Sequence, residues 1–327
     1  MSRRQQLLQL LADGRWHSGE ELAASLGLSR AAVWKQLGVL RDQLGLHIHS
    51  VRGRGYKLPE QLELLEEGII RSALSDDTLE WVSQIEIHDT ITSTNSHLME
   101  KGAGNIRTGH VCLAERQSEG RGRRGRNWAS PFGSNIYLSL FWEYGLAPAA
   151  LSGISLAAGL AVIRALRQLG VSEIGLKWPN DILHGEKKLA GLLLEVAGEQ
   201  SGPSRVVLGL GLNVRLKESD AETIDQPWES LSRLPGGATL SRNRIVAALL
   251  ENLVTVLAQF EQNGLKGMIT EWRQYDLFDG KRVVLQMGSR QIEGVHRGVE
   301  SSGALLLETA DGIRAFHGGE VSLRRLD

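Results

Sequence analysis

A chain of 327 residues, with 42% hydrophobic and 23% charged residues, has the composition of an ordinary globular protein and length enough for two or three domains. These values exclude a disordered chain, a collagen and a disulfide-rich miniprotein. The formal net charge is −1, yet the first sixty residues hold nine Lys and Arg against five Asp and Glu, which leaves +4 there and −5 in the remainder. A basic segment joined to an acidic body is typical of a nucleic-acid-binding module fused to another domain.

Three short helices are predicted in the first forty-five residues. Leucines at helical spacing predict a first helix that ends at Gly14. Ser18 and Glu21 form a capping box for a second helix, which ends at Gly27, and Ser29 caps a third. Two capped helices joined through a short Leu-Gly-Leu segment are a helix-turn-helix pattern, in which the later helix enters the major groove of DNA.

A β-hairpin is predicted next, over residues 47–58, with Arg52 and Arg54 at its tip. This hairpin would be the wing of a winged helix. We expect DNA contacts from the start of the third helix and from the wing, namely from Ser29, Arg30, Ala31, Lys35, Arg52 and Arg54. A small helical docking domain is the alternative, but the local charge of +4 and the basic wing favour DNA binding.

Three features of the sequence bear on where the protein works. The uncharged stretch between Glu143 and Arg164 is long enough to cross a membrane, but Gly, Ser and Pro dilute it and its helical pattern continues to Gly170, so we predict a buried helix. The single cysteine, Cys112, lies in a strand-like segment and is expected to be a core thiol rather than a nucleophile. The N-terminal apolar run is broken by polar residues, so we expect a cytoplasmic protein without a secretory signal.

The middle of the chain, from about residue 65 to 273, predicts an α+β domain without internal repeats. Several neighbouring strands lack a helix between them, which favours a mixed sheet with helices on one face over a doubly wound parallel sheet. The predicted strands are 81–88, 110–115, 135–142, 175–178, 191–196 and 206–214, and the predicted long helices are 151–169 and 244–262.

An arginine-rich loop, Gly120–Arg126, follows the second of these strands. Its glycines match the spacing of a dinucleotide-binding fingerprint, but the segment 127–133 continues as a loop where that motif needs a helix, so we reject this interpretation. Four guanidinium groups among three glycines can instead hold phosphates, through both side chains and backbone N–H groups. An RNA-binding tract and a solvated surface loop are the alternatives.

Three further segments could bind a ligand. Lys177–Asp181 is a turn between strands, and Lys188 with Gly191 opens the next strand, where the lysine could face an anion or simply be solvated. Ser93, Thr94 and Asn95 suit a neutral polar ligand such as a ureido group, and also suit a helix N-cap; both can hold.

Alternating glycines in the segment 208–214 leave room for a flat ligand beside the strand, and the long charged loop 216–238 that follows, with Trp228, is expected to act as a lid. No Walker A sequence and no Gly-x-Ser-x-Gly elbow occur, and the histidines show no metal-binding spacing.

These segments together, in this order, resemble the biotin protein ligase family, and with the winged helix in front the resemblance is to its bifunctional members, which also repress the biotin operon. The segments are Ser93–Asn95, Gln117, Gly120–Arg126, Trp128, Lys177–Asp181, Lys188–Gly191 and Gly209–Val214. The resemblance implies that biotin and ATP form biotinyl-5′-AMP, with Mg²⁺ on the ATP phosphates, and that biotin then passes to a lysine of the biotin carboxyl carrier protein of acetyl-CoA carboxylase.

The resemblance also implies roles for residues. Biotin would be held by Ser93, Thr94, Asn95, Gln117, Arg121, Gly122, Arg123, Lys188 and Gly191. The adenylate would be contacted by Arg123, Trp128, Lys188, Asn213 and Trp228. Lys188, Arg121 and Arg123 would be the catalytic groups, by compensating charge. The metal ligands stay unknown, although the Asn180-Asp181 turn is a candidate from oxygen chemistry alone.

The C-terminal segment predicts a small all-β domain with strands at 283–286, 291–299, 304–308 and 313–316, for which the resemblance implies an SH3-like barrel. We therefore expect a winged helix-turn-helix domain at 1–62, a catalytic domain at 63–276 and the SH3-like domain at 277–327. The expected partners are the carrier protein and operator DNA, with a homodimer when the adenylate is bound and no membrane. A biotin-sensing regulator without ligase activity, and a lipoate ligase, are the alternatives.

Overall fold

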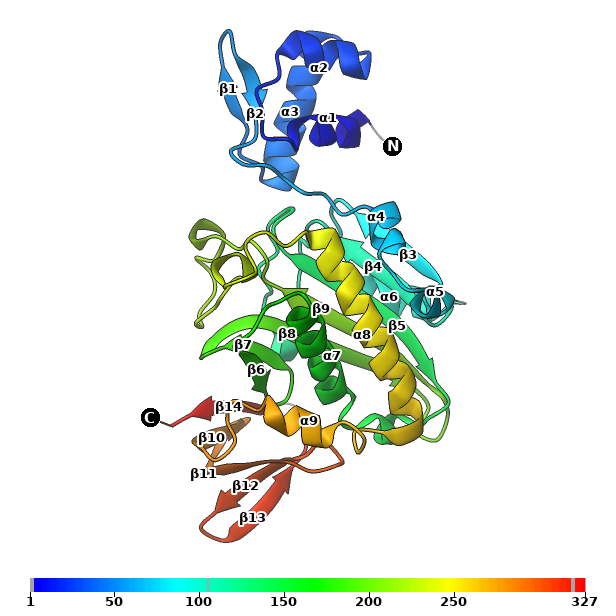
Figure 1. Cartoon of the computed structure of the whole chain (residues 1–327), viewed down its shortest axis with the longest axis vertical. Coiled ribbons are helices and arrows are strands. Elements are labelled where there is room, and N and C mark those ends of the chain that lie inside the picture. The colour runs from blue at the N-terminus through cyan, green and yellow to red at the C-terminus, as the bar shows by residue number, and fades with distance from the viewer. Residues whose placement is uncertain (1–2, 105, 319–320, 327) are drawn as a thin grey trace.

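The computed structural model describes residues 3–104, 106–318 and 321–326 (Figure 1). Three bodies follow one another along the long axis of the molecule: a helical N-terminal body, a central sheet with helices, and a small C-terminal sheet. Figure 1 shows the N-terminal body at one end, connected to the central body by the segment before α4, and the C-terminal sheet at the other end.

The N-terminal body is the predicted winged helix. It contains α1 (Arg3–Leu11), α2 (Gly19–Leu26), α3 (Arg30–Leu44) and the antiparallel hairpin of β1 (His49–Val51) and β2 (Gly55–Lys57). Both halves of the predicted capping box form, since Ser18 Oγ accepts from the Glu21 N–H and the Glu21 carboxylate accepts from the Ser18 N–H. Gly27 ends α2 in the left-handed conformation, which glycine adopts without a steric penalty.

The core of the winged helix includes a side chain from the central body. Its buried leucines and Val33 from α1, α2 and α3 pack with Phe132, which follows the arginine-rich loop by six residues. The Arg4 guanidinium also lies 3.4 Å from the Asp89 carboxylate, and Arg116 donates to the carbonyl of Gln43. The two bodies therefore share a packed interface.

A mixed sheet forms the central body. In the described residues its seven strands lie in the order β3-β4-β5-β9-β8-β7-β6, with β3 and β4 parallel and the other pairs antiparallel. The strands are β3 (Gln84–His88), β4 (His110–Ala114), β5 (Ile136–Tyr144), β6 (Ile174–Lys177), β7 (Asp181–His184), β8 (Lys187–Gly198) and β9 (Ser204–Leu212). The predicted mixed sheet is confirmed, with one additional strand, β7.

The long helices α7 (Ile154–Gln168) and α8 (Arg242–Asn263) pack against each other on one face of this sheet, as predicted. Two segments, Pro148–Gln168, which ends with α7, and α8 itself, are long and apolar enough to cross a bilayer, but 67% and 61% of their apolar windows are buried in the protein, which confirms the prediction of a buried helix. The short helix α6 (Thr94–Gly102) lies on the opposite face, against β4, β5 and β9. A helix on that face was not predicted, since the sequence pattern favoured helices on one face only.

Three other short helices were not predicted: α4 (Glu67–Ser72), α5 (Asp76–Trp81) and α9 (Ile269–Gln274). Each has only six residues, which is too short for a helical period to show in the sequence. The prediction that a strand begins at Trp81 was wrong, because Trp81 ends α5, and its indole stacks on Trp142 with ring centres 5.1 Å apart.

A buried ion pair joins the start of α8 to the sheet and to the linker. The Arg242 guanidinium, which is fully buried, lies 2.8 Å from the Glu115 carboxylate and also donates to the carbonyls of Asn135 and Glu63. Glu115 accepts from the N–H of Leu65 at 2.6 Å. This network connects the chain after the winged helix to the end of β4.

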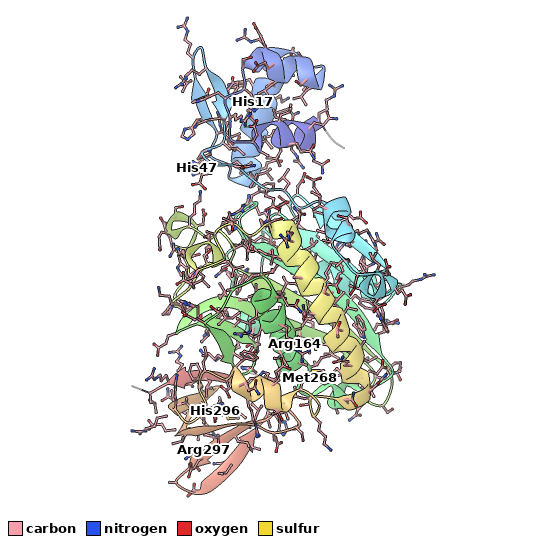
Figure 2. All side chains as sticks on the ribbon, viewed as in Figure 1. His17, His47, Arg164, Met268, His296 and Arg297 are labelled. Atoms are coloured by element: carbon pink, nitrogen blue, oxygen red, sulfur yellow. The ribbon has the colours of Figure 1, made fainter. Side chains whose placement is uncertain are left out.

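The C-terminal body is a five-stranded antiparallel sheet in the order β13-β12-β11-β10-β14 in the described residues. Its strands are β10 (Arg282–Met287), β11 (Arg290–Val299), β12 (Leu305–Thr309), β13 (Gly312–Phe316) and β14 (Val321–Arg325), of which β14 was not predicted. Figure 2 shows His296 in this sheet, and its ring lies 2.5 Å from the Asp276 carboxylate in a fully buried pair. That pair holds the sheet against the segment after α9.

Candidate active site

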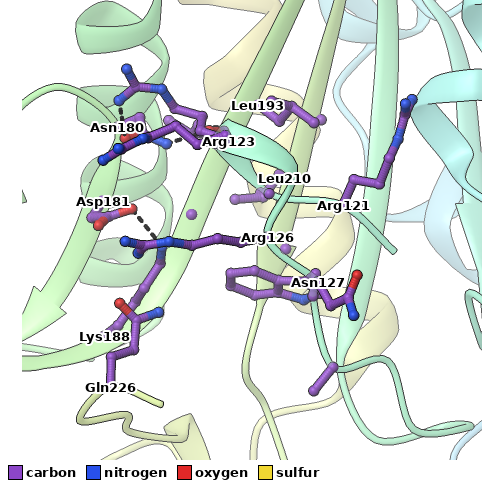
Figure 3. Close-up of a pocket in the computed structure, with 18 of the residues that line it drawn as sticks. Arg121, Arg123, Arg126, Asn127, Asn180, Asp181, Lys188, Leu193, Leu210 and Gln226 are labelled. Atoms are coloured by element: carbon purple, nitrogen blue, oxygen red, sulfur yellow. Dashed lines mark hydrogen bonds and ion pairs between the residues drawn. The ribbon is translucent and has the colours of Figure 1, made fainter. Parts of the chain in front are cut away.

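A cavity of about 750 Å³ opens on the sheet face that α6 partly covers (Figure 3). The arginine-rich loop, α6, β8, β9 and the loop 223–227 all contribute to its walls. Gly191, Gly209 and Gly211 lie on this face of the sheet, since register pairs Gly191 with Gly211 and period two places Gly209 beside them. The volume is within the range of protein sites for small molecules.

The neutral wall of the cavity is made by the start of α6. Ser93 caps this helix through its hydroxyl, and Thr94 and Asn95 are buried in its first turn. The N–H and the hydroxyl of Thr94 both donate to Gln117 Oε1, at 2.9 and 3.1 Å. The Ser139 hydroxyl donates to Asn95 Oδ1 at 2.6 Å. The sequence predicted that this segment could be a helix N-cap and could also face a ligand. Ser93 caps α6, and Ser93, Thr94 and Asn95 all line the cavity.

Two glycines are required by close packing at the cavity. A Cβ atom at Gly209 would lie 2.2 Å from Asn95 Oδ1, and one at Gly211 would lie 2.3 Å from Cε2 of Trp128. Both distances are far below van der Waals contact. Any side chain at these positions would therefore displace Asn95 or the indole of Trp128, which is the physical basis of the alternating glycines predicted to leave room beside the strand.

Substituting Gly209→Ala is expected to weaken the binding of biotin, the ligand that the family resemblance implies, at least tenfold, because the new methyl group must push Asn95 away from the cavity. Calorimetric titration of biotin would measure this. In an Asn95→Ala background the same substitution should have little further effect, since the clashing group is gone. Equal losses in both backgrounds would contradict the assignment to Asn95.

Glu195 was missed by the sequence analysis. Its carboxylate accepts from Asn95 Nδ2 at 2.8 Å and lies 3.6 Å from the Arg121 guanidinium, so it connects the neutral wall to the arginine-rich loop. The sequence pattern could have identified Glu195, because side chains two residues apart on a strand share a face, and Glu195 is four residues after Gly191 on β8. Ser139 was missed as well, for want of any motif around it.

The arginine-rich loop forms one side of the cavity. Arg121 donates to the Ser96 hydroxyl at 2.7 Å, and Arg123 donates to Asn180 Oδ1 at 3.0 Å. Asn180 in turn donates to the Leu192 carbonyl at 2.6 Å, so Arg123 is attached to β8 through a positioned amide. Burial lowers the pKa of Arg123 by disfavouring its charged form, and the nearby Asp181 carboxylate opposes this effect.

Lys188 lies beside Asp181 in the lining of the cavity (Figure 3). Its Nζ is 2.7 Å from Asp181 Oδ1 and 5.4 Å from the centre of the Trp128 ring. The lysine is therefore not a solvated hairpin residue, which was the alternative. The Asn180-Asp181 turn, considered above for metal binding, holds the two cationic groups Arg123 and Lys188 in place.

The cavity is strongly cationic. Among the described residues that line it, seven Lys and Arg face three Asp and Glu. Lys177 and Arg126 belong to segments that were predicted to bind a ligand, whereas Arg324, which comes from β14 of the C-terminal sheet, was not predicted. Burial lowers the pKa of Lys177, although the Asp181 carboxylate acts in the other direction. Such a lining favours a ligand with several negative charges.

All nine residues predicted to bind biotin line the cavity. Of those predicted for the adenylate, Arg123, Trp128 and Lys188 line it too, whereas Asn213 and Trp228 are outside its lining in the described part of the chain. Asn213 is buried and donates to the Glu229 carbonyl at 3.0 Å, and the Trp228 ring is covered by the Arg233 guanidinium at 4.4 Å. The lid segment nearest the cavity is 223–227.

The predicted DNA contacts lie on the surface of the winged helix. Ser29, Arg30, Ala31, Lys35, Arg52 and Arg54 are all exposed. Arg30 lies 3.3 Å from the Glu20 carboxylate, and the Arg54 guanidinium lies over the Trp16 ring at 5.3 Å. The start of α3 and the tip of the wing thus offer basic side chains that remain accessible to a phosphate backbone.

Comparison with known proteins assigns the family. The biotin/lipoate A/B protein ligase family model matches residues 88–213, a helix-turn-helix domain model matches 3–57, and the model of the biotin protein ligase C terminal domain matches 280–324. The chain is 41% identical over 318 residues to a bifunctional ligase/repressor BirA of Salmonella typhimurium, covering 97% of this chain and 96% of that one. It is 40% identical, with the same coverage, to the bifunctional ligase/repressor BirA of Escherichia coli.

A solved biotin protein ligase from Aquifex aeolicus, in complex with biotin and ATP, superimposes with a TM-score of 0.65 and 30% identity, covering 75% of this chain and all of that one. The chain therefore belongs to the biotin/lipoate A/B protein ligase family. Within that family it is similar along almost its whole length to the bifunctional ligase/repressors, and it has the helix-turn-helix that a repressor needs.

Proposed function

We infer that this protein is an ATP-dependent biotin protein ligase that also represses transcription. The observation that carries the ligase assignment is the cavity in which a neutral polar wall, Thr94 and Asn95, faces the cationic pair Lys188 and Arg123. Biotin combines a neutral ureido ring with a carboxylate, and ATP brings phosphates, so one cavity with both walls fits the two substrates in contact.

In the first step, a carboxylate oxygen of biotin attacks the α-phosphorus of ATP, the bond to the β-phosphate oxygen breaks, and pyrophosphate leaves. In the second step, the amine of a carrier-protein lysine attacks the carbonyl carbon of biotinyl-5′-AMP, AMP leaves with the bonding electrons, and the amine loses a proton. Both steps bring anionic groups together, so positioning and charge compensation are the main tasks of the protein.

The residues divide these tasks. Ser93, Thr94, Asn95 and Gln117 hydrogen-bond the biotin ring, with Glu195 and Ser139 orienting Asn95. Lys188 Nζ lies between the biotin carboxylate and the α-phosphate, with Arg121 and Arg123 closing the loop over them. Lys177, Arg126 and Arg324 supply charge for the outer phosphates, and Asn213 holds the backbone next to Lys188.

Mg²⁺ fits this cavity as an ion that arrives with ATP, because most of its oxygen ligands would be phosphates and water. The carboxylates along the cavity are Asp181, Glu186 and Asp225. Asp181 is already 2.7 Å from Lys188 Nζ and Glu186 is 2.7 Å from the Arg325 guanidinium, so Asp225 on the lid is the protein group that would face the ion. The ion would neutralise phosphate charge when bound.

The ligase assignment is tested by transfer of labelled biotin to a purified biotin carboxyl carrier domain with ATP and Mg²⁺. We expect transfer that depends on ATP and releases pyrophosphate. Binding of biotin without pyrophosphate release would instead support a biotin-sensing regulator without ligase activity. Competition by lipoate for adenylation would support the lipoate ligase alternative.

The winged helix supports operator binding as the second function. We propose that biotinyl-5′-AMP is the co-repressor, that its binding favours a homodimer, and that two winged helices then meet a two-fold operator. Operator affinity measured with and without biotin plus ATP tests this coupling, and equal affinities would exclude it.

The proposed domains are 1–62, 63–276 and 277–327. The proposed location is the cytoplasm, where acetyl-CoA carboxylase would be the target.

Removing Lys35 or Arg52 by substitution with alanine is expected to weaken operator binding, because each exposed cation can neutralise one phosphate. The slope of log affinity against log salt concentration should fall by about one for each lost phosphate contact. Lys266→Ala, which removes an exposed cation after α8, is the control and should leave the slope unchanged. Biotin transfer should be unaffected in all three variants.

A further inference from the structure

A cluster of titratable side chains lies beside the active site and is not used by the ligase chemistry. Glu86 and His88 come from β3, His110 and Cys112 from β4, and His97 from α6. The parallel register pairs Glu86 with Cys112, and period two places His88 and His110 on that same face of the sheet, under α6. The sequence showed no metal spacing among these histidines, because the strands and the helix bring them together only in the fold.

Glu86 is the hydrogen-bond acceptor at the centre of the cluster. Its carboxylate accepts from Lys101 at 2.5 Å, from His97 Nε2 at 2.9 Å and from His110 Nε2 at 2.5 Å. Burial of Glu86 opposes its ionisation, but these three hydrogen bonds outweigh burial and lower its pKa to about 2. Because an ionised carboxylate only accepts, Nε2 of His97 carries a hydrogen and Nδ1 keeps a lone pair when the ring is neutral.

Cys112 is the buried member. Its side chain is fully buried in β4, and the thiol forms no hydrogen bond within the part of the chain that the structure describes. One ring nitrogen of His88, one of His97 and the Cys112 Sγ all lie within 4.8 Å of one another. The rings of His88 and His97 stand edge to face with centres 4.9 Å apart. Two imidazoles and a thiol thus converge on one point.

We propose that His88, His97 and Cys112 bind a divalent transition metal of the borderline-soft class, with Zn²⁺ as its representative, and that Glu86 supports the histidine ligands from outside. Nitrogen and sulfur donors select such ions over Mg²⁺ and Ca²⁺, which prefer oxygen. Three protein ligands leave the fourth tetrahedral position to water. The site is separate from the Mg²⁺ that accompanies ATP.

The geometry needs only a small closure. With Zn–N near 2.0 Å and Zn–S near 2.3 Å, ligand atoms in a tetrahedral site lie roughly 3.5 Å apart, so a contraction of about 1 Å within the triangle completes it. Side-chain rotation of the half-buried His88 and His97 can supply this. A histidine ligand commonly donates its other ring N–H to a carboxylate, which is the contact that His97 makes with Glu86.

Metal binding here would act on the biotin wall. Cys112 pairs across the sheet with Ser139, whose hydroxyl donates to Asn95, and His97 lies on the same helix as Thr94 and Asn95. A metal bound to His97, Cys112 and His88 would attach α6 to β4 and β3, next to the residues proposed to bind biotin.

The test uses the full-length protein after removal of metals. Zn²⁺ titrated against a chromophoric chelator should bind at one equivalent, and Co²⁺ in its place should give the near-ultraviolet charge-transfer band of a cobalt–thiolate bond. Cys112→Ala should remove that band, and His97→Gln should weaken Zn²⁺ binding at least tenfold. His49→Gln, at an exposed histidine on β1, is the matched control and should change neither.

Circular dichroism without metal checks that each variant is folded. A supporting second result is a rise in the melting temperature of the parent protein on adding Zn²⁺, absent in Cys112→Ala. Zn²⁺ binding that survives Cys112→Ala unchanged, or Co²⁺ bound without a thiolate band, would overturn the site. Neither result would touch the ligase assignment, because biotin transfer is measured separately with ATP and Mg²⁺.

Discussion

Lys188→Ala is expected to lower the rate of biotinyl-5′-AMP formation by about 10²- to 10³-fold, the effect typical of removing one preorganised group that stabilises transition-state charge. The Lys188 ammonium lies 2.7 Å from Asp181 and faces the Trp128 ring, so its position is fixed before substrates bind. Pyrophosphate release in a single-turnover experiment measures the step directly. The loss should appear in the rate constant more than in biotin affinity.

Lys187→Ala is the matched control for this variant. Lys187 is the preceding residue of β8, but its side chain is mostly exposed and lies 3.4 Å from the Glu229 carboxylate, outside the cavity lining. Its removal should leave pyrophosphate release within about twofold of the parent. If both lysines mattered equally, general attraction of ATP to a basic surface would explain the data better than a positioned group.

Arg242→Met is expected to destabilise the protein by about 3–5 kcal/mol, because it leaves the Glu115 carboxylate buried without its charged partner. The carbonyls of Asn135 and Glu63 lose their donors in the same variant. Denaturant unfolding followed by near-ultraviolet circular dichroism measures the change. The double variant Arg242→Met, Glu115→Leu should recover much of the loss, since no charge is then stranded.

Arg244→Met serves as the control two residues along α8. Arg244 is exposed, so its loss should change the free energy of unfolding by less than about 0.5 kcal/mol. Similar effects of the two substitutions would show that a shared property of the helix start, and not the burial of Arg242, causes the loss of stability.

Much of the fold could be predicted where neighbouring residues in the sequence determine the local structure. The capping box at Ser18 and the left-handed Gly27 define α2 from a few neighbouring residues, and the long apolar periods of α7 and α8 are visible along the chain. Helices of six residues, such as α5, carry less than two helical periods. The strand predicted over 81–88 begins only at Gln84 for that reason, because alternation and a short helix look alike over so few residues.

The active site was predictable where motifs carry it and not where distant strands meet. The arginine-rich loop is found by its composition, and Lys188 is found through the motifs that resemble the biotin protein ligase family. Arg324 lies in the C-terminal sheet, so only the fold brings it to the cavity, and the buried Ser139, which donates to Asn95, has no neighbouring motif. The His88, His97 and Cys112 cluster is the extreme case, since its members lie on three separate elements.

The position of Phe132 has a consequence for how the protein can be divided. This ring fills part of the hydrophobic core of the winged helix, although the chain reaches it seventy residues after that body ends. A fragment that stops at residue 62 would lack one wall of its own core, and a ligase trimmed of its first 62 residues would present an uncovered aromatic ring to water. Chimaeras that exchange the winged helix between relatives therefore need to transfer the residue at position 132 with it. The hydrophobic core of the winged helix is built from two separate stretches of sequence, and both must match.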